Sequence, residues 1–567
     1  MTNKLLNILS PILLLILFLV PELQAQTGWA HPYSESVVVV AEEFAGQAGL
    51  EILNQGGNAV DAAVAVQFAL AVTLPRAGNI GGGGFMVLHL QDGTIRTLDF
   101  REKAPLHAYR DMYLDEDGEY ITELSRTGAL ASGVPGTVDG MITALEHYGR
   151  LPLETVMQPA IRLAKEGFLI SRTLADELNE FADQLRQFPS SAAYFTKSGD
   201  ERWQQGDHFV QNDLGETLER IARYGRRGFY TGITAQRIVI TMREQGGIID
   251  YEDLRTYRSS WREPLQTDFE GYTLYMMPPP SSGGFVIQQT LEMLKDFDVR
   301  SLGFNSADYV HLLSETWRRS FADRNYHLGD PDFADISPVL QTRQYNRDRM
   351  RRFDPERATP SSDLSHGEPP IMLESSETTH FSILDREGNA VAVTTTLNGS
   401  FGNKLAVQGG GFLLNNEMDD FSAKPGEPNM FGLIGAEANA IQPGKRMLSS
   451  MTPTIVTRNG QVRMILGAAG GPRIITATLQ NFLNLALFDM NIQQAIHAPR
   501  FHHQWLPDQI TVEPFALSRD TETILRERGH TLSEMESIGR SHIIYVDEEG
   551  RKYGAADPRG DGSVHGR

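Results

Sequence analysis

The sequence predicts an α+β fold in which helices cover packed β-sheets. Residues 138–260 have the amphipathic pattern of helices, whereas the chain past residue 378 is rich in short runs typical of strands. Helical segments also flank the long β runs. Because such elements bury their apolar faces against one another, they stack into layers around a shared core. No internal repeat or low-complexity block interrupts this pattern.

Composition excludes several classes of function. The chain has 567 residues, a formal net charge of −21 and no cysteine. Its length allows one to four domains and a sizeable core. An acidic chain lacks the basic footprint that binds nucleic acids or anionic membranes, so neither is an expected partner, and the acidity itself serves solubility. The lack of cysteine excludes disulfides, thiolate nucleophiles, zinc fingers and cysteine-ligated iron–sulfur clusters.

The first 25 residues have the pattern of a signal peptide. Lys4 supplies the positive start, and the apolar run over 12–20 is too short for a membrane-spanning helix, which needs about 20 residues. Ala25 is a small residue suited to cleavage before Gln26. We therefore predict an exported mature protein, periplasmic or secreted, with an uncleaved anchor as the alternative. No later stretch is long and apolar enough to span a bilayer.

The N-terminal elements are a strand and two helices. Residues 36–40, a serine and four valines, are typical of a buried strand, and residues 41–54 follow a helical pattern. Two glycines end that helix, and Asn58 can cap the next one over 59–72. This second helix is apolar nearly all round, which predicts deep burial.

Four consecutive glycines, residues 81–84, precede a strand predicted over 85–90. A following lysine with serine or threonine is missing, and so is the G-x-G-x-x-G spacing, so neither phosphate-loop motif is met. A close crossing of two backbones is the better interpretation, because glycine has no Cβ. A further strand ends near 97–102, where Arg101 can either reach into a site or form a structural ion pair.

The middle of the chain alternates strands, helices and turns. We predict a short linker starting at 251–254, a strand over 272–276, and helices over 285–294 and 305–327. Residues 354–377 are rich in Pro, Ser, Asp and Glu and form the most linker-like stretch of the chain. A flexible, exposed tether of this kind is where a backbone cut costs the fold least.

Two adjacent threonines follow this linker and open a strand-like run. A second run over 389–396 comes after a short turn. Threonine pairs in strands usually serve only as β-branched residues that fit a pleated surface. The tether before this pair leads to a different prediction: the chain is cut between Glu377 and Thr378, and Thr378 becomes an N-terminal nucleophile. Thr379 is then its neighbour in the strand.

The C-terminal part is predicted to contain strands over 409–414, 453–456, 462–466, 543–546 and 553–556, and helices over 474–488 and 492–498. Gly470 and Gly471 stand between a strand and a helix. Backbone N–H groups at such a junction are not used by the helix and can point at an anion, as in an oxyanion hole. The same junction can also be purely structural.

Metal and adhesion motifs are weak. His502 and His503 could ligate a metal, but adjacent histidines on one element point in different directions, and no H-E-x-x-H motif occurs. Residues 115–118 fail the calcium-loop pattern because Tyr113 occupies its first position. The Arg-Gly-Asp tripeptide at 559–561 is too short to be informative. We therefore expect no metal and no cofactor.

A series of longer motifs occurs in order along the chain: AGNIGGGGFM (77–86), DFREKAP (99–105), ASGVPGTV (131–138), PPPSSGG (278–284), ADRNYHLGDPDF (322–333), TTHFS (378–382), LLNNEMDDFS (413–422), LSSMTPTI (448–455), GGPRIIT (470–476) and APRFHHQWLPD (498–508). In these motifs the sequence strongly resembles the gamma-glutamyltranspeptidases, also called glutathione hydrolases, of the N-terminal-nucleophile superfamily. The likeness runs from about residue 30 to the C-terminus.

The resemblance implies a four-layered αββα sandwich, formed jointly by two subunits from one precursor. The large subunit would span residues 26–377, ending in the polar linker, and the small catalytic subunit 378–567. The implied chemistry is plausible from first principles, because the amine of an N-terminal threonine can act as general base for its own hydroxyl. In the precursor the same hydroxyl can attack the preceding carbonyl, which gives an N-to-O acyl shift and then hydrolysis.

The resemblance also implies substrates and residue roles. Implied substrates are glutathione and other γ-glutamyl compounds, which form a γ-glutamyl ester on Thr378 that water, an amino acid or a peptide resolves. The implied roles are Thr396 as a hydrogen-bond partner of the nucleophile, Gly470 and Gly471 as the oxyanion hole, Arg101, Ser449 and Ser450 as ligands of the α-carboxylate, and Asn398, Glu417 and Asp420 as ligands of the α-ammonium.

One departure and two alternatives belong beside this interpretation. Residues 422–447 are long enough for the lid that some members carry, but Phe431 stands where the aromatic is often tyrosine, so a lid hydrogen bond would be missing. A related acylase for glutaryl or cephalosporin side chains is one alternative. Asp420 with Arg101 argues against it, because a glutaryl group has no ammonium. The other alternative is an exported binding protein that is never processed.

Overall fold

The computed structural model describes residues 30–364, 378–427, 429–430 and 433–567. The predictions made for the signal peptide, for Glu377 and for Phe431 therefore lie outside the described residues. Within the described ranges, no helix combines the length and the apolar character that crossing a membrane requires.

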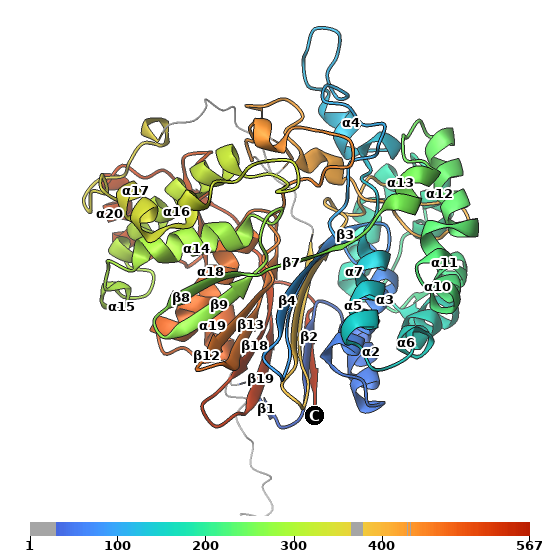
Figure 1. Cartoon of the computed structure of the whole chain (residues 1–567), viewed down its shortest axis with the longest axis horizontal. Coiled ribbons are helices and arrows are strands. Elements are labelled where there is room, and N and C mark those ends of the chain that lie inside the picture. Colours follow the sequence, from blue (N-terminus) through green and yellow to red (C-terminus); the bar gives the residue numbers. More distant parts are fainter. Residues whose placement is uncertain (1–29, 365–377, 428, 431–432) are drawn as a thin grey trace, which may run out of the picture.

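Two large sheets form the centre of the molecule (Figure 1). The first sheet has the strand order β20 (Ser563–Gly566), β2 (Val37–Val40), β10 (Thr379–Leu384), β11 (Ala390–Thr396), β3 (Gly83–His89), β4 (Ile95–Asp99) and β7 (Ser260–Arg262). The second has the order β1 (Pro32–Tyr33), β19 (Lys552–Ala556), β18 (Arg540–Val546), β13 (Gln461–Leu466), β12 (Thr454–Arg458), β9 (Tyr272–Met276) and β8 (Leu265–Phe269), and β14 (Ala468–Ala469) pairs with β18.

Helices lie on the outer side of each sheet in Figure 1. Those up to β7 are α2 (Glu43–Asn54), α3 (Ala59–Thr73), α4 (Thr122–Arg126), α5 (Thr137–Tyr148), α6 (Leu153–Glu166), α7 (Arg172–Glu180), α8 (Ala182–Leu185), α9 (Pro189–Phe195), α10 (Asn212–Tyr224), α11 (Arg227–Tyr230), α12 (Gly232–Glu244) and α13 (Tyr251–Thr256). Those after it are α14 (Gly283–Leu294), α15 (Val299–Leu302), α16 (Ala307–His327), α17 (Arg343–Arg349), α18 (Arg473–Leu487), α19 (Ile492–His497) and α20 (Arg519–Glu527). Two small sheets join β5 (Phe168–Leu169) to β6 (His208–Phe209), and β15 (Phe501–His502) to β16 (Ile510–Val512) and β17 (Leu532–Glu534). The predicted mixture of helices and strands is confirmed.

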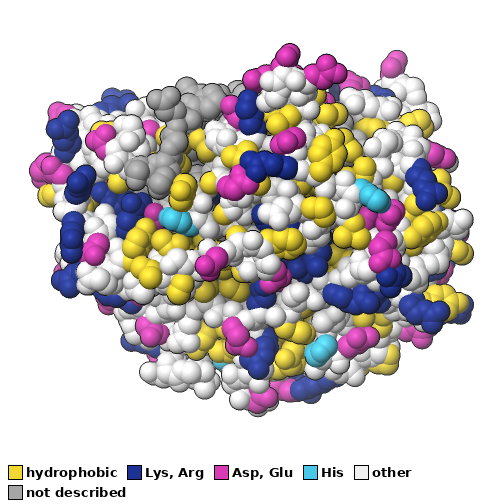
Figure 2. All heavy atoms as spheres, turned by 45° about the horizontal axis from the view of Figure 1, so that its top comes forward, with side chains coloured by type: hydrophobic (Ala, Val, Ile, Leu, Met, Phe, Trp, Pro, Cys, Tyr) yellow, Lys and Arg dark blue, Asp and Glu magenta, His cyan; other side chains and the backbone are white. Residues whose placement is uncertain are grey.

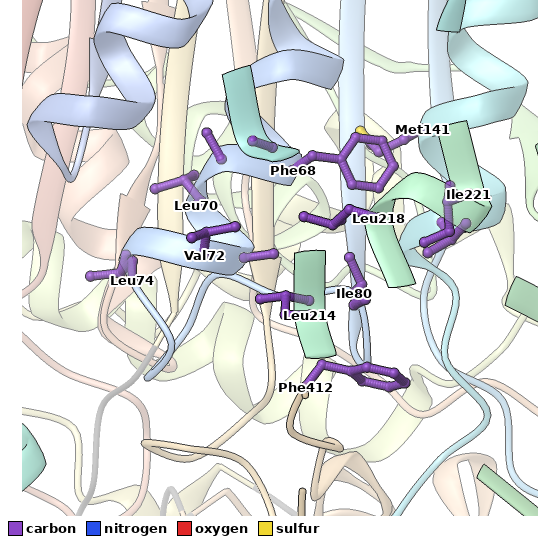
Figure 3. Close-up of a cluster of buried hydrophobic side chains, with 14 of the residues drawn as sticks. Phe68, Leu70, Val72, Leu74, Ile80, Met141, Leu214, Leu218, Ile221 and Phe412 are labelled. Carbon is purple, nitrogen blue, oxygen red and sulfur yellow. The ribbon is translucent and has the colours of Figure 1, made fainter. Parts of the chain in front are cut away.

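Helix α3 is the buried centre of the helical layer on the first sheet. It starts with a capping box, in which the Asn58 side chain accepts from the backbone of Asp61 and the Asp61 carboxylate accepts from the backbone of Asn58. Every residue of α3 is buried, as its apolar sequence predicted. Figure 3 shows Phe68 of this helix in the same apolar cluster as Met141 of α5 and Leu218 of α10.

Strand β2 shows how the first sheet is covered on both faces. Val38 and Val40 belong to the apolar core shared with the helices, whereas Val37 and Val39 belong to a core that also holds residues of the second sheet, such as Ile455. Successive side chains of a strand point to opposite faces. A run of valines is therefore what a strand buried on both sides requires.

The glycine run at 81–84 is a close crossing of backbones, as predicted. A Cβ on Gly82 would lie 2.1 Å from the carbonyl oxygen of Thr396, and one on Gly81 would lie 2.0 Å from that of Leu413. No side chain fits at these distances. The glycines therefore allow the start of β3 to lie directly against the end of β11.

Two predicted elements are wrong. Residues 251–254 are not a linker but the start of helix α13, which Asp250 and Asp253 initiate with a capping box. Residues 409–414 are not a strand, because Gly409 and Gly411 have φ of 70° and 76°, which turn the chain back on itself. Only an isolated bridge, between Ala406 and Leu413, remains there.

Two further differences concern the ends of the two proposed subunits. Within the described part of the predicted linker, residues 354–364, most side chains are exposed, but Ser361 is 2% exposed and its hydroxyl accepts from Arg318 at 2.6 Å. Strand β20 was not predicted, because four residues with one valine give no strand pattern; it pairs with β2.

Acidic and basic side chains are mixed on one face of the molecule. Figure 2 shows acidic and basic side chains interspersed on the face that carries the top of Figure 1. This face presents no extended patch of a single sign.

Candidate active site

Thr378 lies at the end of the first sheet, directly before β10, and is 6% exposed. The register pairs Thr379 with Thr395, so the neighbouring Thr396 of β11 ends at the same edge. A cavity of about 20 Å³, room for roughly one water molecule, opens there. Its lining residues are Arg101, Thr378, Thr396, Asn398, Glu417, Asp420, Leu433, Ser449, Ser450, Met451, Gly471 and Ile474. All the residues proposed for catalysis and substrate binding except Gly470 are thus brought together.

Arg101 is the centre of a buried charge cluster. It follows β4, is 1% exposed, and places its guanidinium 2.5 Å from Glu417 Oε2 and 2.5 Å from Asp420 Oδ2. Glu102 Oε2 lies 3.6 Å from the same guanidinium. The Arg101 Nε group donates to the carbonyl oxygen of Met447 at 3.3 Å. Both interpretations offered for Arg101, a site residue and an ion pair, therefore apply at once.

The four charges shift one another's pKa. Burial by itself lowers the pKa of Arg101, but the charges of Glu417, Asp420 and Glu102 outweigh it and raise that pKa. Burial raises the pKa of Glu417 and of Asp420, and it raises that of Glu102 to about 8, against the opposing charge of Arg101. Three acidic side chains surround the Arg101 guanidinium, and the charge of Arg324 also acts on Asp420. Acidic side chains outnumber basic ones here, which suits the cavity to a cationic group.

Asn398 connects the end of β11 to the acidic cluster. Its φ of 78° turns the backbone so that its N–H donates to Thr396 Oγ1 at 2.8 Å. Its side-chain amide donates to the carbonyl oxygen of Asn416 at 3.0 Å, and Asn416 precedes Glu417. The positions of Thr396 and Glu417 are thus coupled through one residue.

Ser449 and Ser450 close the cavity from the second sheet. The Ser449 backbone donates to the carbonyl oxygen of Pro280 at 2.8 Å, and its hydroxyl accepts from the N–H of Met451 at 3.1 Å. The Ser450 hydroxyl is buried without a hydrogen-bond partner among the described residues. A buried, unsatisfied donor at a cavity wall is available to a ligand oxygen.

Gly470 and Gly471 lie between β14 and α18, as the sequence indicated. Their φ values are 132° and 57°, a backbone that glycine adopts without strain. Gly471 lines the cavity. Gly470 does not, and a Cβ on it would lie 3.0 Å from the Cα of Gly539. Only one of the two expected oxyanion groups thus reaches the cavity wall.

The two adjacent histidines do not share an ion. His502 contacts Thr476 Oγ1 through Nδ1 and Gln504 through Nε2, each at 2.8 Å. His503 accepts from the backbone of Trp505 with Nδ1 and lies 3.4 Å from Asp508 through Nε2. Burial lowers the pKa of His502 to about 3 and that of His503 to about 4, so both are neutral.

Within the described ranges, the side chains of His311, Glu315 and His530 are near enough to one another to hold a metal ion. No sequence pattern pointed to this group: His311 and Glu315 are one helical turn apart, but His530 lies 219 residues after His311. His311 Nδ1 and His530 Nε2 are already 2.7 Å apart and share a hydrogen bond. Glu315 accepts from Arg318 at 3.2 Å and Arg319 at 2.6 Å. Two guanidinium groups beside the position disfavour a cation there.

Four residues of the site were missed by sequence reasoning. Glu102 is adjacent to Arg101 in the DFREKAP motif, so its charge was a usable signal. The other three, Leu433, Met451 and Ile474, are apolar wall residues. Apolar side chains have the same pattern in a cavity wall as in a core, so no signal could have identified them.

Comparisons with known proteins agree with this site. A family model described as Gamma-glutamyltranspeptidase matches residues 45–566. The glutathione hydrolase proenzyme of Escherichia coli (strain K12) is 46% identical over 533 residues, covering 93% of this chain and 91% of that protein. The structure of cephalosporin acylase from Bacillus halodurans matches with a TM-score of 0.84 and 28% identity, over 95% of this chain and 97% of that one.

A solved chain of Helicobacter pylori gamma-glutamyltranspeptidase is also similar. It matches with a TM-score of 0.56 and 42% identity, over 59% of this chain and 97% of its own length. The family model and the relative from E. coli both extend over most of the sequence. The chain therefore belongs to the gamma-glutamyltranspeptidase family.

Proposed function

We propose that this chain is a γ-glutamyltransferase and glutathione hydrolase whose nucleophile is Thr378. The observation that carries the proposal is that Arg101, Glu417 and Asp420 line the same cavity as Thr378. A γ-glutamyl group has an α-carboxylate and an α-ammonium on one carbon, so it offers a partner for each sign of charge. The name of the relative from E. coli, glutathione hydrolase, supports the same substrate class.

Substrate binding exchanges partners within the charge cluster. In this structure, Arg101 pairs with Glu417 and Asp420. The α-carboxylate of a γ-glutamyl group takes over the forked donors of Arg101, since a planar carboxylate matches a guanidinium. The two acids are then free for the α-ammonium, with Asn398 beside them. The Ser450 hydroxyl, together with Ser449, completes the carboxylate site.

The chemistry uses groups of the chain alone. The Thr378 hydroxyl first attacks the carbonyl carbon of Glu377, the peptide bond becomes an ester, and water hydrolyses it. This frees the amine of Thr378, which then accepts the hydroxyl proton as general base. The hydroxyl oxygen attacks the γ-carbonyl, and the N–H of Gly471, which lines the cavity, stabilises the oxyanion, with Gly470 as its expected partner. The leaving amine takes a proton, and water or an acceptor amine resolves the ester.

We further infer the assembly and location that this chemistry implies. The large subunit is residues 26–377 and the small subunit 378–567, and they form a heterodimer with the αββα sandwich of N-terminal-nucleophile hydrolases. The face-to-face sheets with outer helices in Figure 1 support this architecture. Residues 1–25 act as a signal peptide, and the mature protein is exported. Glutathione, other γ-glutamyl compounds and acceptor amino acids or peptides are its partners.

Cleavage and turnover of a γ-glutamyl anilide test the proposal together. Purified protein is expected to give two bands, and N-terminal sequencing of the smaller band is expected to begin Thr-Thr-His-Phe. Thr378→Ala removes the hydroxyl, so it should stay in one piece and release no product. Thr379→Ala is the matched control and should still be cut. A Thr378→Ala chain that cleaves and turns over would overturn the proposal, and an intact, inactive wild-type band would support a binding protein instead.

A related acylase is the second candidate. The structural similarity to a cephalosporin acylase favours it. Asp420 and Glu417 favour γ-glutamyl substrates, because a glutaryl group presents no ammonium to their two carboxylates. Hydrolysis of γ-glutamyl and glutaryl anilides by the same preparation separates the two. We expect kcat/KM to favour the γ-glutamyl compound, and a preference for glutaryl would establish the acylase.

A further inference from the structure

Two adjoining hollows form a groove beside the active site. The nearer hollow, about 600 Å³, contains Gly399, Asn416 and Met430 in its wall, and the farther one, about 890 Å³, is lined by parts of β5, α7 and the turn before β20. Both hollows share Arg76, Glu177 and Arg540. We call the nearer hollow, with these three residues, the acceptor groove.

The acceptor groove adjoins the catalytic cavity on one side and the glycine junction at 470–471 on the other. On one side its wall continues from Asn398, a lining residue of the cavity, to Gly399. On the other side, Arg540 of β18 lies opposite Ala469 of β14 in the sheet, and Ala469 is the residue before Gly470. Opposed residues of antiparallel strands have Cα atoms about 5 Å apart. Arg540 therefore starts within one residue of the oxyanion glycines, and its long side chain lines the groove.

Arg76 is fixed at the other wall of the acceptor groove. Its guanidinium pairs with Glu177 at 3.0 Å, and its backbone carbonyl accepts from the N–H of Phe401 at 2.9 Å. The second contact ties Arg76 to the loop that follows Asn398. Two arginines, one on each side, thus share the part of the groove where the two hollows meet.

The charge of the groove is unusual for this chain. The net charge of the protein is −21, yet the nearer hollow is lined by four basic residues and three acidic ones. The basic residues are Arg76, Arg126, Lys404 and Arg540, and the acidic ones are Glu123, Glu177 and Glu180. This local balance suits a ligand with a carboxylate more than the rest of the acidic surface does.

We propose that Arg540, with Arg76, binds the C-terminal carboxylate of the peptide that leaves or accepts the γ-glutamyl group. This inference rests on the proposed function. The peptide amine must lie at the γ-carbonyl on Thr378, and a dipeptide extends about 7 Å from there to its carboxylate. Arg540 lies opposite Ala469, beside the glycine junction, and lines the groove, and its fork suits a carboxylate. Leaving and accepting peptides share the site, because transfer is the reverse of ester formation.

Acceptor selectivity in the matured protein tests the assignment. With a γ-glutamyl anilide as donor, transfer to glycylglycine is compared with transfer to glycylglycinamide, whose carboxylate is replaced by an amide. Wild type should prefer glycylglycine in kcat/KM for the acceptor, and Arg540→Gln should reduce this preference at least about fivefold. Arg519→Gln, on exposed α20, is the matched control and should keep the wild-type ratio. The readout is a ratio, so a change in overall turnover does not affect it.

Each outcome decides one point. An unchanged ratio in Arg540→Gln would overturn the assignment of Arg540, while anilide turnover would still support the proposed function. Absence of anilide turnover in wild type would instead overturn the proposed function itself. If Arg540→Gln does not mature, Arg540→Lys is measured instead. Lysine keeps the charge but loses the fork, so the preference should fall by a smaller factor. A full wild-type ratio in Arg540→Lys would then count against the assignment.

Discussion

At the scale of single residues, the site is defined by three acidic side chains grouped around Arg101. Arg101 faces Glu417 and Asp420 at 2.5 Å each and Glu102 at 3.6 Å. All four side chains are nearly or fully buried, so solvent screens their interaction little. A second cation is the natural complement of this cluster. The α-ammonium of the proposed γ-glutamyl substrate would supply it.

Glu102 predicts a pH-dependent stability. Burial raises its pKa from 4.5 to about 8, so the folded chain holds a proton there that the unfolded chain releases above pH 4.5. Its contribution to stability is therefore fully present below pH 4.5 and is lost as the pH rises to 8. The glutamine of Glu102→Gln cannot ionise. At pH 8.5 the free energy of unfolding of this variant should therefore exceed that of its parent by about 1–3 kcal/mol.

Denaturant unfolding of the Thr378→Ala chain, with and without Glu102→Gln, measures this difference at pH 5 and pH 8.5. The gain should shrink at pH 5, where the carboxyl is protonated in the folded parent. Glu116→Gln, at an exposed turn, is the control and should match the parent at both pH values. An equal gain at both pH values would show that packing, and not ionisation, is responsible.

At the scale of elements, the glycine run at 81–84 holds Thr396, at the end of β11, in place beside Thr378. A Cβ on Gly82 would lie 2.1 Å from the Thr396 carbonyl oxygen. This oxygen belongs to the backbone, which cannot move aside as the end of a flexible side chain can. Gly82→Ala should therefore displace the end of β11 and cost about 1–3 kcal/mol of stability, as overpacking does. We expect loss of cleavage before Thr378 and of anilide turnover.

Gly93→Ala separates this local effect from general destabilisation. Gly93 has φ of 85° with no atom near its missing Cβ, so alanine there adds backbone strain in a distant turn. The variant should melt at a lower temperature but still mature and turn over. Normal maturation and turnover of Gly82→Ala would contradict the role assigned to the crossing. Band patterns and anilide assays of both variants provide the comparison.

The sequence predicts those parts of the fold that depend on residues adjacent in the chain, and not those that depend on contacts between distant residues. The burial of α3, the glycine crossing and the position of Arg101 just past a strand depend on residues adjacent in the chain, and all were predicted. Strand β20 exists because β2 offers an edge, which no local pattern reveals. Residues 409–414 were predicted as a strand because of their apolar residues, but two of their glycines adopt positive φ.

The site follows the same division. The polar members were predicted by resemblance of motifs, and the structure brings nine of the ten to one cavity. The distance from Arg101 to Glu417 and Asp420 depends on the packing of β4 against a distant loop, so spacing along the chain cannot give it. The apolar walls at Leu433 and Ile474 have no distinguishing pattern either. Gly470 shows the limit of motifs, because it belongs to the glycine pair but lies off the cavity wall.

At the scale of the whole molecule, the two proposed subunits are interlocked. Strands β10 and β11, which follow Thr378, lie between β2 and β3, which precede it. In the second sheet β12 pairs with β9 across the same division. The apolar cores are shared too, since Phe381 and Val393 pack in the cluster that contains α3. One cut in the backbone therefore leaves every layer intact.

This interlocking predicts that the cleaved chains stay together under any condition that preserves the sheets. Exposed ion pairs across the division, such as Arg150 with Glu387, are screened by salt, but buried apolar strands are not. A tag on the C-terminus of the small chain should therefore retain the large chain in 1 M NaCl on an affinity column. Guanidinium chloride at a denaturing concentration should release it. The uncut Thr378→Ala chain is the control for retention, since it elutes as one band in both buffers. Release of the large chain by salt alone would show that surface charges hold the two chains together, contrary to the shared sheets and cores.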